Sequence, residues 1–263
     1  MRRFFVGPEN IGGGTIVIDS RDDLHHMIKV LRLKEGDSVE VSDTVEWEYE
    51  GVIESLDEDE AVVRITDKQA FSGEPHTRVT LFQGIPKQGK MEVIVQKCVE
   101  MGVSEIVPVF MERTVVVDKG KFGKKIERWN KVSAEAVKQC RRGVIPPVRD
   151  AVKMKELLAD TTGSGRPDVF EDFDLVLFPY ENEKGTTIKD TLLTVTSPMY
   201  TEIKGGAPER VAIIIGPEGG FSEAEAEAIV NGGGCSVSLG KTVLRTETAG
   251  IAALAMVMYE LEL

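Results

Sequence analysis

Two glycine-rich segments near the end of the chain carry the residue types and spacing of a ligand site. The first, GPEGG at 216–220, directly follows the apolar run VAIII at 211–215. The second passes through Gly240 and Leu244 and follows the run at 235–239. Apolar, largely β-branched runs of this length predict buried strands, and glycines let a ligand approach the backbone closely. We therefore expect both loops at the carboxyl ends of parallel strands, where such sheets bind their ligands.

A third loop of the same kind is expected at 179–183, after the apolar run 175–178. The pattern G-x-G-x-x-G of dinucleotide sites is absent, and Glu218 places a carboxylate where a pyrophosphate would lie. A ligand without phosphate, such as S-adenosylmethionine, fits these loops better. The alternative is that all three are only tight connections. A helix is expected after the strand 211–215, capped by Ser222 with Glu225. Another is expected after the strand 235–239, with Thr246 as its candidate cap.

Residues 84–91 (GIPKQGKM) imitate a phosphate-binding P-loop after a predicted strand and before a predicted helix. Met91 stands where a magnesium-binding Ser or Thr is required, and Pro86 removes one of the amides that would hold phosphate. Nucleotide hydrolysis is therefore disfavoured. Lys87 and Lys90 remain available for an RNA backbone.

Charge is distributed unevenly along this acidic chain, whose net charge is −12. A basic group near the N-terminus, for which a solvated surface is the alternative, consists of Arg2, Arg3, His26, Lys29, Arg32 and Lys34. A helical wheel places a second basic group, Arg128, Lys131, Lys138, Arg141 and Arg142, on one side of a helix over 127–142. A solvated helix face is again the alternative, but so concentrated a stripe favours contact with a polyanion.

The 263 residues, 41% of them apolar, are enough for two domains. Short alternating runs up to residue 70 predict a small antiparallel barrel or sandwich with a short helix at 26–32. Residues 70–76 are expected to be a linker, beyond which alternating strands and helices predict an α/β domain with a parallel sheet. Residues 195–208 are expected to be a loop.

The chain offers no sign of a membrane or of a metal site. No apolar run approaches the roughly 20 residues that span a bilayer. The three cysteines lack metal-like spacing. We expect a cytoplasmic protein without a metal.

The sequence resembles the small-subunit ribosomal RNA uracil-N3 methyltransferases of the SPOUT class over nearly its whole length. The resemblance rests on RRFFV, HMIKVLR, KMEVIVQKCVEMGVSEIVP, the 127–142 helix with Pro146, IIIGPEGGFSEAE and SLGKTVLRTETA. Thr242 departs from the family pattern, which usually carries arginine at that position.

The resemblance implies an α/β fold class with a PUA-like RNA-binding β-barrel at 1–72 and an α/β domain with a deep trefoil knot at 73–263. It implies a homodimer that methylates N3 of a uridine in small-subunit ribosomal RNA, with the RNA expected within an assembled or nearly assembled subunit. Two other readings stay open, a ribose 2′-O-methyltransferase of the same knotted class and a non-catalytic ribosomal RNA-binding protein. The expected S-adenosylmethionine-binding residues are Leu177, Pro179, Glu181, Gly216, Pro217, Glu218, Gly219, Gly220, Leu239, Gly240, Leu244 and Thr246. The expected RNA-binding residues are Arg2, Arg3, His26, Lys29, Arg32, Lys87, Lys90, Arg128, Lys131, Lys138 and Arg142.

Arg245 is the expected catalytic residue. N3 of uracil carries a proton at neutral pH, so attack on a sulfonium methyl group requires that proton to leave. A guanidinium remains charged at any working pH and can stabilise the negative charge that develops on the uracil oxygens. The alternative role for Arg245 is a structural ion pair with Glu247 or Glu218. The three loops contain no Cys or His, which disfavours a covalent route.

Overall fold

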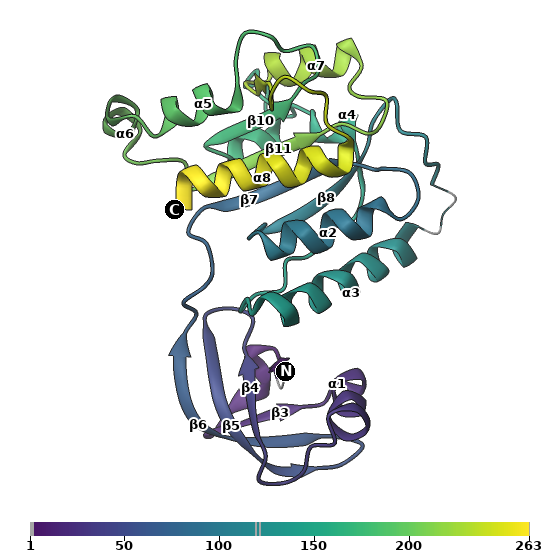
Figure 1. Ribbon diagram of the computed structural model, residues 1–263, viewed down its shortest axis with the longest axis vertical. Coiled ribbons are helices and arrows are strands. Elements are labelled where there is room, and N and C mark those ends of the chain that lie inside the picture. The colour runs from purple at the N-terminus through teal and green to yellow at the C-terminus, as the bar shows by residue number, and fades with distance from the viewer. Residues whose placement is uncertain (1–2, 119, 121, 263) are drawn as a thin grey trace. The chain divides into compact units, whose positions relative to one another are not determined.

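The computed structural model describes residues 3–118, 120 and 122–262, which form two compact units (Figure 1). One unit comprises the residues up to Glu74 together with Val137–Ile145, and the other comprises Pro75–Ala136 and the residues from Pro146 onward. No helix in the described part of the chain is long and apolar enough to cross a membrane.

The first unit is built on a six-stranded sheet in the order β1-β4-β5-β6-β3-β2. Its strands are β1 (Arg3–Phe5), β2 (Ile11–Gly12), β3 (Thr15–Ile18), β4 (Ser38–Ser42), β5 (Trp47–Leu56) and β6 (Ala61–Ala70). The predicted strands are confirmed, and all pairs are antiparallel except β1 with β4, which is parallel. Alternate residues of these strands, such as Ile16 and Ile18 of β3, face a shared apolar core.

The predicted helix of the first unit begins earlier than residue 26. The helix α1 (Arg21–His25) leads directly into the π-helical turn η2 (His26–Val30). Ser20 caps α1 by accepting a 3.4 Å hydrogen bond from the Asp23 amide, a start signal that lies outside the predicted span. A 3-10 turn, η1 (Pro8–Asn10), precedes β2.

The second unit has a six-stranded sheet in the order β12-β10-β11-β7-β8-β9, in which every neighbouring pair is parallel. Its strands are β7 (Arg78–Gly84), β8 (Glu105–Phe110), β9 (Val152–Lys153), β10 (Leu175–Pro179), β11 (Arg210–Ile215) and β12 (Cys235–Val237). This confirms the predicted α/β architecture with a parallel sheet.

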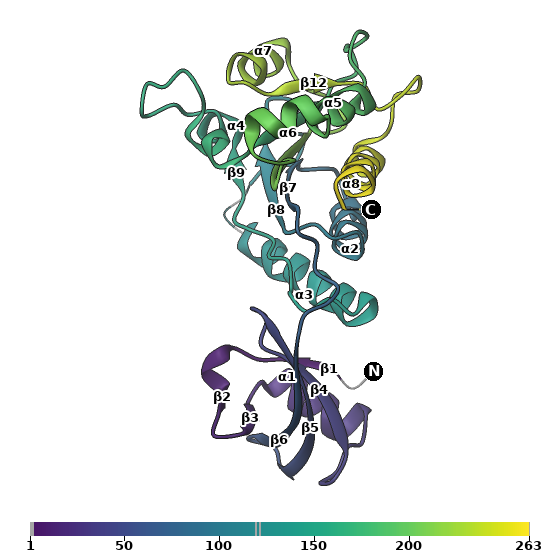
Figure 2. The same cartoon turned by 90° about the vertical axis from the view of Figure 1, so that its left-hand side faces the viewer.

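Helices cover both faces of this sheet (Figure 2). They are α2 (Lys90–Glu100), α3 (Phe122–Cys140), α4 (Met154–Leu157), η3 (Asp168–Asp172), α5 (Ile188–Val195), α6 (Pro198–Lys204), α7 (Glu223–Asn231) and α8 (Thr246–Glu262). Helix α8 packs on β7, β11 and α2. Buried side chains of α4 and α7 pack on the other face, against alternate residues of β11 such as Ile214.

The prediction of a loop at 195–208 was wrong, because α6 occupies half of it. Ser197 caps this helix with a 3.3 Å hydrogen bond from the Tyr200 amide. Pro198 stands at the first helical position, where its missing N–H removes no helix hydrogen bond.

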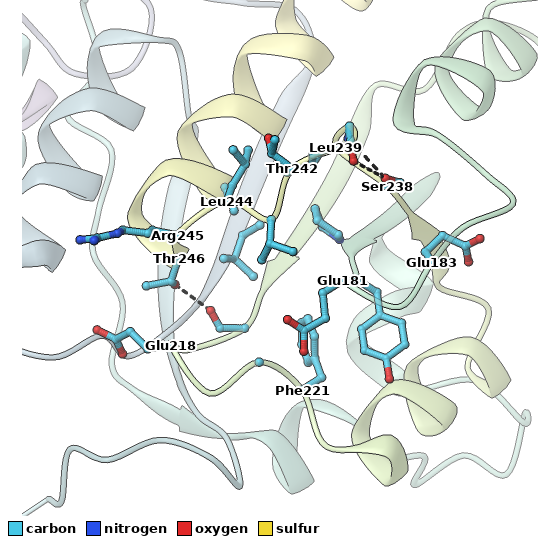
Figure 3. A pocket seen from close by; sticks show the side chains of 18 of the residues that line it. Glu181, Glu183, Glu218, Phe221, Ser238, Leu239, Thr242, Leu244, Arg245 and Thr246 are labelled. Carbon is cyan, nitrogen blue, oxygen red and sulfur yellow. Dashed lines mark hydrogen bonds between the residues drawn. The ribbon is translucent and has the colours of Figure 1, made fainter.

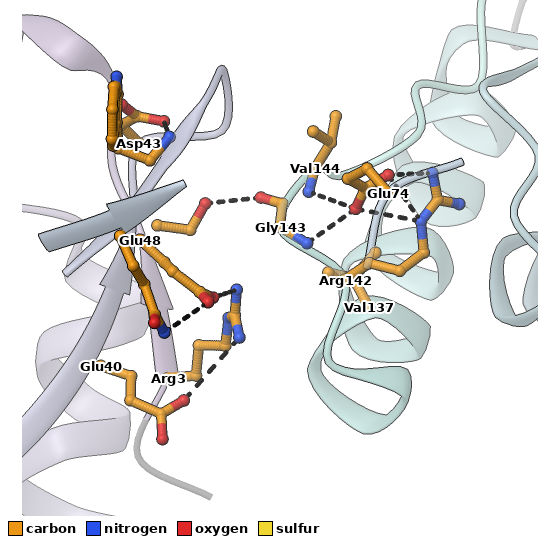
Figure 4. A network of polar contacts seen from close by, with 12 residues as sticks. Arg3, Glu40, Asp43, Glu48, Glu74, Val137, Arg142, Gly143 and Val144 are labelled. Carbon is orange, nitrogen blue, oxygen red and sulfur yellow. Dashed lines mark hydrogen bonds and ion pairs between the residues drawn. The ribbon is translucent and has the colours of Figure 1, made fainter. Parts of the chain in front are cut away.

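A polar network joins the segment 137–145 to the rest of the first unit (Figure 4). The Glu74 carboxylate accepts hydrogen bonds from the Arg142 guanidinium at 2.8 Å and from the Gly143 amide at 2.8 Å. The Ser42 hydroxyl donates a 2.6 Å bond to the Gly143 carbonyl. Helix α3 ends at Cys140, so the helical wheel that extended the helix to residue 142 was wrong for Arg141 and Arg142.

Candidate functional site

Three loops that follow β10, β11 and β12 border one cavity of about 840 Å³ (Figure 3). Because β10 pairs in parallel with both other strands, the carboxyl ends of all three meet at one edge of the sheet. The sequence predicted these loops, and the structure brings them together. The predicted residues that line the cavity are Pro179, Glu181, Gly216, Pro217, Glu218, Gly220, Leu239, Gly240, Leu244, Arg245 and Thr246.

Leu177 and Gly219, which were also predicted, do not line the cavity. Leu177 is fully buried within β10. The Gly219 carbonyl accepts a 3.0 Å hydrogen bond from the Arg113 guanidinium, and a Cβ on Gly219 would meet the Arg113 Cβ at 2.9 Å. Both positions therefore face other parts of the protein.

The expected cofactor-binding residues left out an aromatic and apolar part of the cavity wall. Tyr180 and Phe221 both line the cavity, with ring centroids 6.3 Å apart, and Ile215 and Val243 add aliphatic surface. Each of these residues is adjacent to a predicted one in the sequence. Loop membership was therefore the signal that could have found them.

Two glycines are required by the way the loops fold. Gly84 ends β7, and a Cβ there would lie 2.6 Å from the Pro217 nitrogen and 2.8 Å from the Ile215 carbonyl oxygen. Gly220 has φ +68°, and a Cβ there would meet the Glu181 carboxylate at 3.2 Å. Gly84 thus permits close packing behind the loop, whereas Gly220 permits its left-handed turn beside the cavity.

Thr246 does not cap α8, contrary to the prediction. Arg245 holds the cap position, and its carbonyl accepts 2.8 Å hydrogen bonds from the amides of Thr248 and Ala249. The buried Thr246 hydroxyl instead donates a hydrogen bond to the Gly216 carbonyl and accepts one from the side-chain amide of Gln83. Thr246 therefore links its own loop to the loop after β11 and does not stabilise the start of α8.

The turn that imitates a P-loop holds the carboxylate of Glu218. The turn lies between β7 and α2, as predicted. The Lys87 amide donates a 2.9 Å hydrogen bond to Glu218 Oε1, and the Lys90 ammonium donates one of 3.0 Å to the same oxygen. An internal carboxylate therefore takes the place that a phosphate has in a true P-loop.

Lys90 also forms a 3.1 Å ion pair with Glu247 in the first turn of α8. Hydrogen bonds to Glu218 and then to Glu247 raise the pKa of Lys90 above its ordinary value. Burial alone would raise the pKa of Glu218 and of Glu247, but hydrogen bonds and the Lys90 charge outweigh it, and both pKa values are lowered. All three groups therefore remain charged around neutral pH.

Arg245 lies at the cavity with an exposed side chain. Among the residues that the structure describes, no carboxylate forms an ion pair with its guanidinium, and Glu218 and Glu247 both pair with Lys90 instead. The structural pair considered as the alternative is therefore not formed.

The residues predicted to bind RNA differ in exposure. Lys29, Arg32, Lys87 and Lys131 are exposed, and His26 is half-buried. Arg128 pairs with Glu92 at 3.0 Å, Lys138 contacts Asp23 at 3.8 Å, and Lys90 holds Glu218 and Glu247. Arg3 and Arg142 are buried, paired with Glu48 and Glu74, both at 2.8 Å (Figure 4). Arg2 lies outside the described residues.

Comparisons with known proteins agree with this architecture. Residues 73–258 match a family model described as an RNA methyltransferase domain, and residues 18–66 match one described as an RNA methyltransferase PUA domain. The chain is 31% identical to ribosomal RNA small subunit methyltransferase E of Bacillus subtilis over 266 residues, covering 100% of this chain and 98% of the relative.

Solved structures of similar proteins include S-adenosylmethionine complexes. One is a methyltransferase of Legionella pneumophila, at 30% identity and a TM-score of 0.79, covering 98% of this chain and 97% of that one. Another is the ribosomal RNA small subunit methyltransferase E of Neisseria gonorrhoeae, at 28% identity and a TM-score of 0.79, with the same coverage. With a PUA domain followed by a parallel-sheet domain whose three loops form one cavity, the chain belongs to the RNA methyltransferase family.

Proposed function

We propose that this protein transfers a methyl group from S-adenosylmethionine to N3 of a uridine in small-subunit ribosomal RNA. The observation that carries the proposal is the single cavity formed by three loops at the carboxyl ends of β10, β11 and β12. Family membership supports RNA methyl transfer, and the solved relatives with bound S-adenosylmethionine support the cofactor. The names of the curated relatives support small-subunit ribosomal RNA as the substrate.

The residues present fit this cofactor. The cavity volume falls within the range of about 300–1,000 Å³ that is usual for small-molecule sites. The carboxylate of Glu181 lines the cavity and can face the sulfonium cation, whereas the carboxylate of Glu218 is already paired with Lys90. The open backbone at Gly220 and Gly240 can accept an adenosine edge, and Phe221 and Leu244 supply apolar surface. When bound, S-adenosylmethionine would supply an electrophilic methyl group.

Arg245 is the residue that we assign to the chemistry. A uridine must be unpaired or flipped out for its N3 to reach a methyl donor in this cavity. The Arg245 guanidinium has no carboxylate partner among the described residues, so its donors are available to the uracil oxygens. It would stabilise the anion that forms when N3 loses its proton.

We assign RNA binding first to the exposed cations Lys29, Arg32, Lys87 and Lys131. Exposed cations can release counterions from phosphates on binding, whereas the buried Arg3 and Arg142 are already paired with Glu48 and Glu74. We retain the homodimer as a proposal, supported by apolar side chains that α2 and α8 expose: Val93 is 47% and Tyr259 is 70% exposed. Light scattering of the purified protein tests it.

Transfer of tritium from labelled S-adenosylmethionine tests the proposed activity. Purified protein should label small-subunit ribosomal RNA, and assembled subunits should be compared with naked RNA as acceptors. Digestion to nucleosides should place the label on the base. Label on the ribose would instead support 2′-O methylation, and RNA binding without transfer would support a non-catalytic role.

A further inference from the structure

We propose that Lys90 is a positioning residue that keeps Arg245 free for the substrate. Its ammonium holds two carboxylates, and one of them, that of Glu247, would otherwise pair with Arg245. This inference rests on the proposed function, since it concerns the residue to which we assign stabilisation of the uracil anion.

Lys90 connects three segments that are far apart in the sequence. It begins α2, and its ammonium lies 3.0 Å from Glu218 in the loop after β11 and 3.1 Å from Glu247 at the start of α8. Only 28% of its side chain is exposed, and the two carboxylate side chains are 24% and 21% exposed. Partial burial reduces screening by solvent, so these pairs are stronger than those of an open surface.

The ion pair between Lys90 and Glu247 matters because Glu247 lies close to Arg245 in the sequence. Glu247 is two residues from Arg245 and feels its charge, which contributes to lowering the pKa of that carboxyl. Guanidinium groups form bidentate pairs with carboxylates and are less strongly hydrated than ammonium groups, so an unpaired Glu247 would attract Arg245. Lys90 prevents this because it already pairs with Glu247.

The two carboxylates differ in what they would lose without Lys90. Glu218 would keep its 2.9 Å hydrogen bond from the Lys87 amide. Glu247 has no other ion pair among the residues that the structure describes. Glu247 is therefore the carboxylate that would capture Arg245.

The test compares Lys90→Ala with Lys90→Arg, with the double variant Lys90→Ala/Glu247→Gln, and with Lys97→Ala as the matched control. Lys97 lies on the same helix and forms a 2.8 Å surface pair with Glu100 outside the cavity. We expect Lys90→Ala to lower kcat roughly 10- to 100-fold, less than complete loss of a group that stabilises an anion. Its Kd for S-adenosylmethionine, measured by calorimetry, should stay within about threefold of wild type.

Three further results would support the assignment. Lys90→Arg should retain most of the rate, the double variant should recover most of what Lys90→Ala loses, and Lys97→Ala should match wild type. Crystals of cofactor-free Lys90→Ala should show Arg245 hydrogen-bonded to Glu247, a readout independent of activity.

Other results would overturn it. They are an unchanged rate in Lys90→Ala, a loss that the double variant does not recover, or an unpaired Arg245 in the Lys90→Ala crystals. An inactive wild-type protein would instead count against the proposed function, which separates the two failures.

Discussion

The Thr246 hydroxyl donates a 2.7 Å hydrogen bond to the carbonyl of Gly216, thirty residues earlier in the chain. The same hydroxyl accepts a 2.9 Å hydrogen bond from the side-chain amide of Gln83 near the end of β7. A single buried side chain thus joins two of the loops that border the cavity to the central sheet. The Thr246 hydroxyl therefore serves to link the loops, whereas Arg245 occupies the cap position of α8.

Replacing Thr246 with valine should destabilise the protein by about 1–3 kcal/mol, because the Gly216 carbonyl would lose its partner in a buried place. Affinity for S-adenosylmethionine should fall as well, since the two loops lose their link. Thr246→Ser keeps the hydroxyl and is the control. Urea unfolding and calorimetry measure both effects, and equal behaviour of the two variants would contradict a role for the hydroxyl.

Replacing Arg245 with alanine should lower the rate of methyl transfer roughly 100- to 1,000-fold, with cofactor affinity nearly unchanged. The defect should shrink as the pH rises towards the pKa of uracil N3, because the substrate then loses its proton without help. Single-turnover rates across a pH series measure this. Joint loss of cofactor affinity and activity, without recovery at high pH, would argue against the catalytic assignment.

Replacing Gly220 with valine should abolish cofactor binding while the fold survives. A β-branched residue at φ +68° costs about 1–3 kcal/mol of backbone strain, and its side chain would crowd Glu181 at the cavity. Gly123→Ala in α3 is the control, since a Cβ there meets no atom within 4 Å. Unchanged affinity in a folded Gly220→Val protein would remove Gly220 from the cofactor site.

The basic residues should separate into two classes. Lys131→Ala should lower RNA affinity and reduce the salt dependence of binding by about one unit of slope, as expected for one lost phosphate contact. Arg142→Ala should instead destabilise the protein by about 3 kcal/mol, because it leaves the Glu74 carboxylate without its cation. Salt titrations and urea unfolding distinguish these outcomes. A stable Arg142→Ala protein with weakened RNA binding would reverse the division.

Local sequence signals predicted much of the second unit. The β-branched run of β11 and the capping box of Ser222 with Glu225 act within a few residues, and both were confirmed. The helix α6 was missed although Ser197 and Pro198 are local start signals of the same kind. The parallel pairing of β1 with β4 was beyond reach, because it joins Arg3 to Glu40 through a register that no local pattern encodes.

The loops that form the site could be predicted from the sequence, but the contacts between their side chains could not. The sequence shows that Lys90 and Glu218 are charged, yet their pairing depends on which loops the strand order of the sheet brings together. In the same way, Arg3 and Arg142 look like surface cations in the sequence, and only the folded chain shows that each is buried against a glutamate. A trefoil knot, which the resemblance implies, is likewise a property of the whole chain path rather than of any sequence window.

Mass spectrometry of nucleosides from small-subunit ribosomal RNA tests the central claim most directly. RNA from cells that lack this protein should have lost a 3-methyluridine, and the wild-type gene should restore it whereas an Arg245→Ala gene should restore far less. An unchanged 3-methyluridine content, or loss of a 2′-O-methylated nucleoside in its place, would contradict the account.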